Sequence, residues 1–136
     1  MAEDGDGPAG LTGTWHGHYM YPAARDPVPF TANLIDREGQ IGGSVTETAT
    51  SRRIAGTRLY ATIAGHYSGA TVVFTKTYEA NEGGYTEVAY EGRLSADRLE
   101  IAGVWRLVDW SGRFVMRRPG KLKKAAEQRV SLLEPV

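Results

Sequence analysis

The 136-residue sequence contains no cysteine, so disulfide bonds and thiolate chemistry are excluded. It also has no apolar run near the ~18 residues that a membrane-spanning helix needs. The first seven residues are acidic and glycine-rich, without the basic and apolar segments of a secretory signal. Phosphate-binding glycine loops, nucleophile elbows and zinc motifs are missing as well. These absences lead us to expect a cytoplasmic protein with no metal ion and no cofactor.

Formal charges sum to zero, but they are unevenly distributed along the chain. Three acidic residues fall within 1–7, whereas 113–136 carries seven basic and two acidic residues. A basic tail can attract nucleic acid or an anionic lipid surface, or it can be the solvated face of a helix. We favour the solvated helix and expect no nucleic-acid partner. Nothing in the sequence specifies an oligomeric state.

Glycine is abundant, with 17 residues, and β-branched and aromatic residues alternate with polar ones through most of the chain. That alternation predicts strands rather than helices. Eight strands are expected, near 13–21, 29–35, 40–48, 58–67, 70–78, 85–94, 98–107 and 112–118. The predicted fold class is therefore all-β.

The connections between the predicted strands are of two kinds. Three are tight and contain the glycine, aspartate or serine that hairpin turns need: 36–39, 68–69 and 95–97. The others are mostly longer: 22–28, 49–57, 79–84 and 108–111. Because alternate connections of an up-and-down meander fall at the same end, the tight turns close one end and the long loops surround the other. We predict an eight-stranded antiparallel up-and-down β-barrel, whose closure removes exposed strand edges.

The barrel is expected to be one domain, covering residues 11–118. A flexible acidic tail is expected to precede it, at 1–10. In the following tail, 119–136, a Pro-Gly pair ends the last strand, and four apolar residues then recur at near-helical spacing: Leu122, Ala126, Val130 and Leu133. This spacing predicts a short amphipathic helix over 121–133 that packs on the barrel wall.

Side chains alternate across a strand, so the apolar members of each strand indicate which residues face the barrel interior. This parity places two charged side chains, Glu47 and Lys76, on the inner face near the long-loop end. The strand between them carries small inward residues, which leaves room for the two charges to approach. A charge that faces inward is costly unless it is paired or solvated. Two interpretations follow: both charges reach water at the rim, or they form the polar part of a ligand site.

The ligand interpretation predicts a mouth lined by aromatic residues around the two charges: Tyr19, Phe30, Glu47, Lys76, Tyr78, Tyr90 and Trp105. Such a pocket suits an aromatic or amphipathic molecule with an anionic or hydrogen-bonding head. Two alternatives stay open. One is an isomerase-like or cyclase-like enzyme that uses Glu47 and Lys76 as acid and base. The other is a structural or interaction barrel with a filled core. Binding is favoured over catalysis, because a pair of charges alone does not specify a reaction.

The sequence resembles the calycin superfamily, which includes lipocalins, avidins and fatty-acid-binding proteins. The resemblance rests on the Gly13-Thr14-Trp15 opening of the first strand, the eight alternating strands, a basic residue on the last strand and a trailing helix. In lipocalins the Trp of this motif closes the barrel floor and packs under an Arg. The resemblance therefore implies that Trp15 closes the floor here, with Arg117 or Arg118 as its partner. The Thr-Asp-Tyr motif of lipocalins is missing, and no single family is implied.

His16 and His18 share one face of the first strand, an arrangement that can chelate a metal ion. The inward direction of Trp15 points this pair outward, and His66 lies on another strand. Two solvent-facing histidines are therefore expected rather than a metal site.

Overall fold

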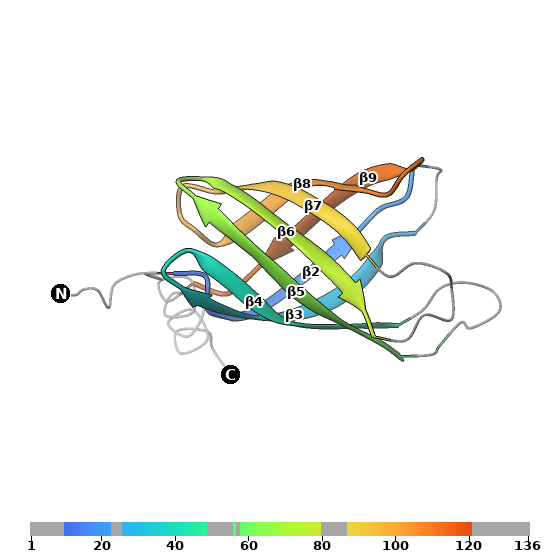
Figure 1. Cartoon of the computed structure of the whole chain (residues 1–136), viewed down its shortest axis with the longest axis horizontal. Coiled ribbons are helices and arrows are strands. Elements are labelled where there is room, and N and C mark those ends of the chain that lie inside the picture. The colour runs from blue at the N-terminus through green and yellow to red at the C-terminus, as the bar shows by residue number, and fades with distance from the viewer. Residues whose placement is uncertain (1–9, 23–25, 49–55, 57, 80–86, 121–136) are drawn as a thin grey trace, which may run out of the picture.

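The barrel is closed, and its strands follow one another around it in chain order. In a computed structural model of the chain, residues 10–22, 26–48, 56, 58–79 and 87–120 are described. They form one antiparallel sheet in which the last strand pairs with the first (Figure 1). The predicted all-β, up-and-down architecture is confirmed. No helix in the described ranges is long and apolar enough to cross a membrane.

The strand bounds agree with the predicted ones to within two residues at either end. The strands are β2 (Gly13–Tyr19), β3 (Val28–Arg37), β4 (Gln40–Thr48), β5 (Arg58–Ser68), β6 (Thr71–Tyr78), β7 (Glu87–Leu94), β8 (Glu100–Arg106) and β9 (Ser111–Arg117). The helix expected over 121–133 and nearly all of the expected N-terminal tail lie outside the described residues.

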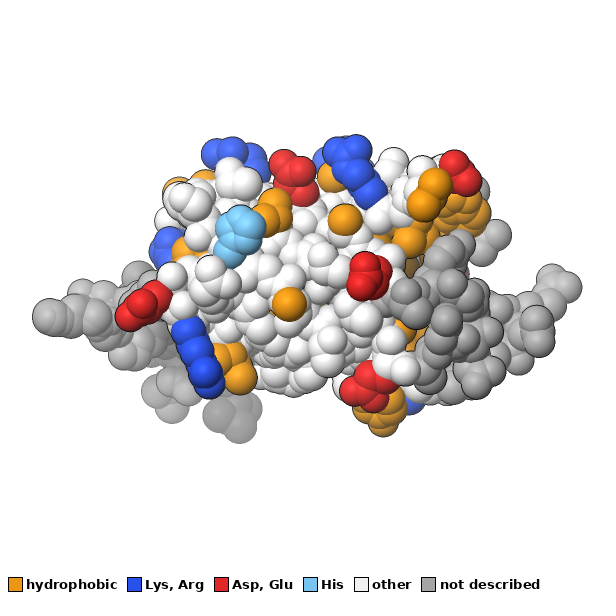
Figure 2. All heavy atoms as spheres, viewed as in Figure 1, with side chains coloured by type: hydrophobic (Ala, Val, Ile, Leu, Met, Phe, Trp, Pro, Cys, Tyr) orange, Lys and Arg blue, Asp and Glu red, His pale blue; other side chains and the backbone are white. Residues whose placement is uncertain are grey.

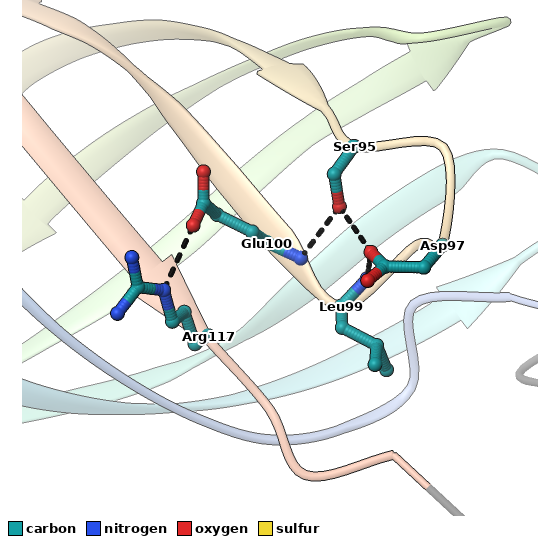
Figure 3. Close-up of polar contacts among 5 residues, drawn as sticks. All are labelled: Ser95, Asp97, Leu99, Glu100 and Arg117. Carbon is teal, nitrogen blue, oxygen red and sulfur yellow. Dashed lines mark hydrogen bonds and ion pairs between the residues drawn. The ribbon is translucent and has the colours of Figure 1, made fainter. Parts of the chain in front are cut away.

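The tight connections meet at one end of the barrel, on the left in Figure 1. Between β3 and β4, Glu38 and Gly39 both have positive φ, 57° and 92°, which is the pattern of a type I′ hairpin turn. Between β7 and β8, the Ser95 hydroxyl donates to Asp97 at 2.6 Å and accepts from the Glu100 amide at 3.0 Å (Figure 3). The short polar side chains therefore close this turn, as the sequence predicts.

The barrel interior holds one hydrophobic core to which every strand contributes. Its largest fully buried side chains are Trp15, Phe114, Leu11, Ile101, Met116, Val28, Val45 and Val72. The alternation is clearest on β7, where Val88, Tyr90, Gly92 and Leu94 are buried and their neighbours are exposed. The outer face is largely polar, and in Figure 2 the charged side chains stand mainly around the margins of an uncharged centre.

Glycine is needed on the inner face where neighbouring strands approach most closely. A Cβ atom at Gly65 would overlap the carbonyl oxygen of Val73, and one at Gly103 would overlap that of Glu91. No side chain fits there without displacing the adjacent backbone. These positions therefore let the sheet coil tightly enough to close with eight strands.

The floor of the barrel is closed by Trp15, whose side chain is fully buried and whose Nε1 donates to the Leu11 carbonyl at 2.9 Å. The Arg118 guanidinium lies 4.6 Å from the centroid of the Trp15 ring, within range of a cation–π contact. Arg117, by contrast, points outward and pairs with Glu100 at 2.8 Å (Figure 3). Of the two partners that the calycin resemblance allows, Arg118 is the one that packs on the tryptophan.

Candidate functional site

The structure brings Glu47 and Lys76 together inside the barrel, at the end opposite the tight turns. Glu47 comes from β4 and Lys76 from β6, and the Lys76 Nζ lies 3.0 Å from the Glu47 Oε1. The two side chains are only 1% and 3% exposed, respectively. On β5, between them, the small buried Ala61 leaves the space that they share. The interpretation that both charges reach water at the rim is therefore wrong.

Two tyrosines complete the hydrogen bonding of the Glu47 carboxylate. The Tyr19 hydroxyl donates to Oε2 at 2.7 Å, and the Tyr78 hydroxyl donates to the same oxygen at 3.0 Å. With the Lys76 ammonium on Oε1, the carboxylate accepts three hydrogen bonds, which is the arrangement that satisfies an ionised carboxylate. Three of its roughly four acceptor sites are engaged, so the geometry favours a positioning role for Glu47 over proton abstraction.

Aromatic rings surround the Lys76 ammonium. Its Nζ lies 4.6 Å from the ring centroid of Tyr19, 5.0 Å from that of Tyr78 and 5.2 Å from that of Tyr90. Phe30 adds a fourth ring at 5.6 Å. All four distances fall within the ~6 Å range of cation–π attraction. The buried ammonium is thus held by one carboxylate and a set of ring faces.

Burial and neighbouring charge act on the proton affinities of these groups. Burial disfavours the ammonium of Lys76, but the oxygens of Tyr90, Tyr78 and Glu47 outweigh burial and raise the pKa of this lysine. Burial raises the pKa of Tyr78 to about 12, although the adjacent ammonium opposes that shift. Burial also raises the pKa of Tyr19 and that of Tyr90. At neutral pH the mouth therefore contains a charged lysine among neutral phenols.

A pocket of about 60 Å³ opens beside this cluster. Its walls are mostly aromatic, and its lining residues are Tyr19, Tyr21, Tyr78, Val88, Tyr90, Trp105, Leu107 and Trp110. The volume is enough for a few water molecules or a small head group, whereas pockets for drug-sized ligands measure about 300–1,000 Å³. In the middle of the barrel, Phe74 stacks on Tyr90 with ring centroids 4.8 Å apart, and Phe114 meets Tyr90 edge-on at 4.9 Å. These rings fill space that an open barrel would leave empty.

All side chains that the sequence assigns to the mouth lie in this cluster. Tyr19, Tyr78, Tyr90 and Trp105 line the pocket, whereas Phe30, Glu47 and Lys76 lie behind its wall. Their ligand-binding role stays a prediction.

The predicted mouth omitted four residues that line the pocket: Tyr21, Val88, Leu107 and Trp110. Leu107 lies at the end of the predicted strand 98–107 with the same parity as Trp105, so alternation could have identified it. Trp110 lies in the connection between β8 and β9, where alternation carries no information. The available signal was only the short length of 108–111, which keeps its aromatic residue beside the mouth.

The remaining candidate for ion binding lies outside the barrel. His16 and His18 are exposed on the outer face of β2, as predicted. Among the described residues, no group of three His, Cys, Asp or Glu side chains is placed to hold a metal ion.

Neither a protein family nor a curated protein matches this chain. The eight-stranded closed barrel and the packing of Trp15 against Arg118 are compatible with a calycin-like fold.

Proposed function

We propose that this protein is a calycin-like barrel that binds the head of a small aromatic or amphipathic ligand at its mouth. The buried pair of Glu47 and Lys76, placed behind an aromatic pocket, is the observation that supports this function. Well-packed apolar residues in place of a buried ion pair are often equally stabilising or better. A barrel that needed only a stable core would therefore gain little from this pair.

The head group is expected to be small, neutral and capable of hydrogen bonding. The charge of Lys76 is already balanced by Glu47 at 3.0 Å, so an anionic head would have to compete with that carboxylate. The hydroxyl oxygens of Tyr19 and Tyr78, which both line the pocket, donate to Glu47 and still have lone pairs that can accept. Of the two head-group types that the sequence suggests, the hydrogen-bonding one fits this geometry better.

The rest of the ligand is expected to lie on an apolar rim. Val108 is 99% exposed, and Trp110, which lines the pocket, is 44% exposed. The Tyr21 ring meets Trp110 and Trp105 edge-on, each with centroids 5.8 Å apart. This surface offers aromatic area to a stem too large for the pocket itself.

Binding can be tested with a panel of phenols, aromatic carboxylates and fatty acids, read by the fluorescence of Trp105 and Trp110. Replacing Tyr78 with Phe removes one hydroxyl and should weaken the best ligand about fivefold, the value of one hydrogen bond. Tyr60→Phe is the matched control, because Tyr60 is 51% exposed on the outer face of β5. The assignment is wrong if no compound binds below about 1 mM, or if the two variants behave alike.

A structural or interaction barrel is the second candidate, favoured by the small volume of the pocket and the stacked rings of Phe74 and Tyr90. In that case, substitutions at the mouth change stability alone. Native mass spectrometry of protein from its own host distinguishes the two, because only a binding protein retains a ligand.

A further inference from the structure

Two hollows of equal size lie on the outer surface of the barrel, away from the mouth pocket. Each has a volume of about 410 Å³, within the range of small-molecule sites. The first, here called the β2–β5 groove, is lined by His16, Gly17, His18, Pro29, Phe30, Thr31, Thr46, Glu47, Thr48 and Arg58. The second, here called the β5–β8 groove, is lined by Ala64, Gly65, His66, Val73, Phe74, Thr75, Ala89, Tyr90, Glu91 and Arg106.

Strand register explains why the β2–β5 groove is hollow. Thr31 on β3 pairs with His16 on β2 and with Thr46 on β4, so short hydroxyl side chains form the floor. His18 flanks this floor from β2, and Arg58 flanks it from β5. Three strand spacings separate the flanking strands, about 14 Å at the backbone. His18 pairs with Pro29 and Arg58 pairs with Thr48, so the two flanking side chains project from the same outer face on either side of the floor.

The groove presents donors without a competing carboxylate. Arg58 supplies a guanidinium, His16 and His18 supply imidazoles, and the threonines supply hydroxyls. The Thr31 hydroxyl and the His16 Nδ1 lie 3.3 Å apart and share a hydrogen bond, which leaves the Nε2 of His16 for a ligand. Glu47 is part of the groove wall, but its side chain is 1% exposed and its carboxylate is bonded inside the barrel. No other acidic residue of the described chain lines this groove. The exposed lining therefore favours an oxyanion.

The β5–β8 groove provides an internal comparison. It also has one arginine, Arg106, and one histidine, His66, but it includes the exposed acid Glu91, and its floor has a single threonine, Thr75, between two alanines. Size alone does not distinguish the two hollows, whereas charge and hydroxyl content do.

We propose that the β2–β5 groove binds a small phosphate ester, with the phosphate held between Arg58 and the imidazoles of His16 and His18. Guanidinium groups recognise phosphate by charge-assisted hydrogen bonds, and the threonine hydroxyls add further donors. The groove is larger than a phosphate ion, so the organic part of the ester lies along its floor on Pro29 and Thr31.

Imidazole signals in NMR give a direct test, because the chain has only three histidines. Titration of the full chain with phenyl phosphate, and separately with inorganic phosphate, should shift the ring signals of His16 and His18 and leave that of His66 unchanged. Phenyl phosphate should bind more tightly than inorganic phosphate. Equal shifts at all three histidines would indicate diffuse ion binding and overturn the proposal.

Two arginine variants separate a built site from general electrostatic attraction. Arg58→Gln should weaken binding of phenyl phosphate at least tenfold, whereas Arg106→Gln, which removes the same charge from the other groove, should change it less than twofold. Equal effects of the two variants would overturn the proposal. Tyr78→Phe, which tests the mouth pocket, should leave phosphate binding unchanged, so the failure of one site is distinguishable from that of the other.

Discussion

Removing one partner of the buried ion pair should destabilise the barrel by an amount that depends on which partner is removed. Lys76→Met is expected to lower the free energy of unfolding by about 3 kcal/mol, the lower end of the range for breaking a buried pair. Glu47 then keeps its hydrogen bonds from Tyr19 and Tyr78. Glu47→Leu is expected to lower it by about 5 kcal/mol, because the ammonium and both hydroxyls lose their acceptor at once.

The double variant, Glu47→Leu with Lys76→Met, decides whether this reasoning holds. Both charges are then gone, and only the hydroxyls of Tyr19 and Tyr78 lack an acceptor, beside a pocket that admits water. We expect a loss of about 2 kcal/mol, which is less than either single variant. Urea unfolding followed by tryptophan fluorescence measures all three. If Glu47→Leu fails to fold, Glu47→Gln takes its place in the cycle. A double variant that loses the sum of the two single losses would refute the coupling.

Three further predictions concern the floor, the coiling of the sheet and alkaline pH. Trp15→Ala should lower the free energy of unfolding by about 3–5 kcal/mol in urea, and a loss below about 1 kcal/mol would contradict a role in closing the floor. Gly103→Ala should lower the thermal midpoint strongly, because its Cβ would overlap the Glu91 carbonyl, whereas Gly42→Ala, whose Cβ would lie 3.6 Å from the Ile63 carbonyl oxygen, serves as the milder control. Stability should fall between pH 10 and about 12, because folded Tyr78 keeps a proton that the unfolded chain releases near pH 10; urea midpoints that stay level or rise across this range would contradict the assignment.

Much of the fold could be predicted because the alternation of apolar and polar residues along a strand indicates which of its side chains face the core. On β6, Val72, Phe74 and Lys76 occupy alternate positions, and all three are buried. The same parity placed Glu47 inward, on the strand beyond the small Ala61. The tight turns at 36–39 and 95–97 could also be predicted, because each needs particular residue types. The first needs a residue that tolerates positive φ, Gly39, and the second needs the side-chain hydrogen bond between Ser95 and Asp97.

The volume of the site could not be predicted. Alternation specifies the face on which Phe74 and Tyr90 lie, but not that their rings stack and fill the middle of the barrel. It also does not determine whether two inward charges meet each other or meet water, because that depends on the distance between strands that are not neighbours. Trp110 was missed for a different reason: it lies in a connection, where no periodic pattern constrains its direction.

The chain enters the first strand and leaves the last strand at the same end of the barrel. Thr12, just before β2, lies with its carbonyl oxygen 3.4 Å from a guanidinium nitrogen of Arg118, just after β9. This meeting point is at the end where the tight turns lie, on the left in Figure 1, opposite the mouth pocket. A linker added before Leu11 or after Arg118 would therefore tether the domain by its base, with the aromatic opening directed away from a sensor chip or a fused reporter. The same proximity makes the barrel a candidate for circular permutation, with the old ends joined and new ones cut in a loop at the far end.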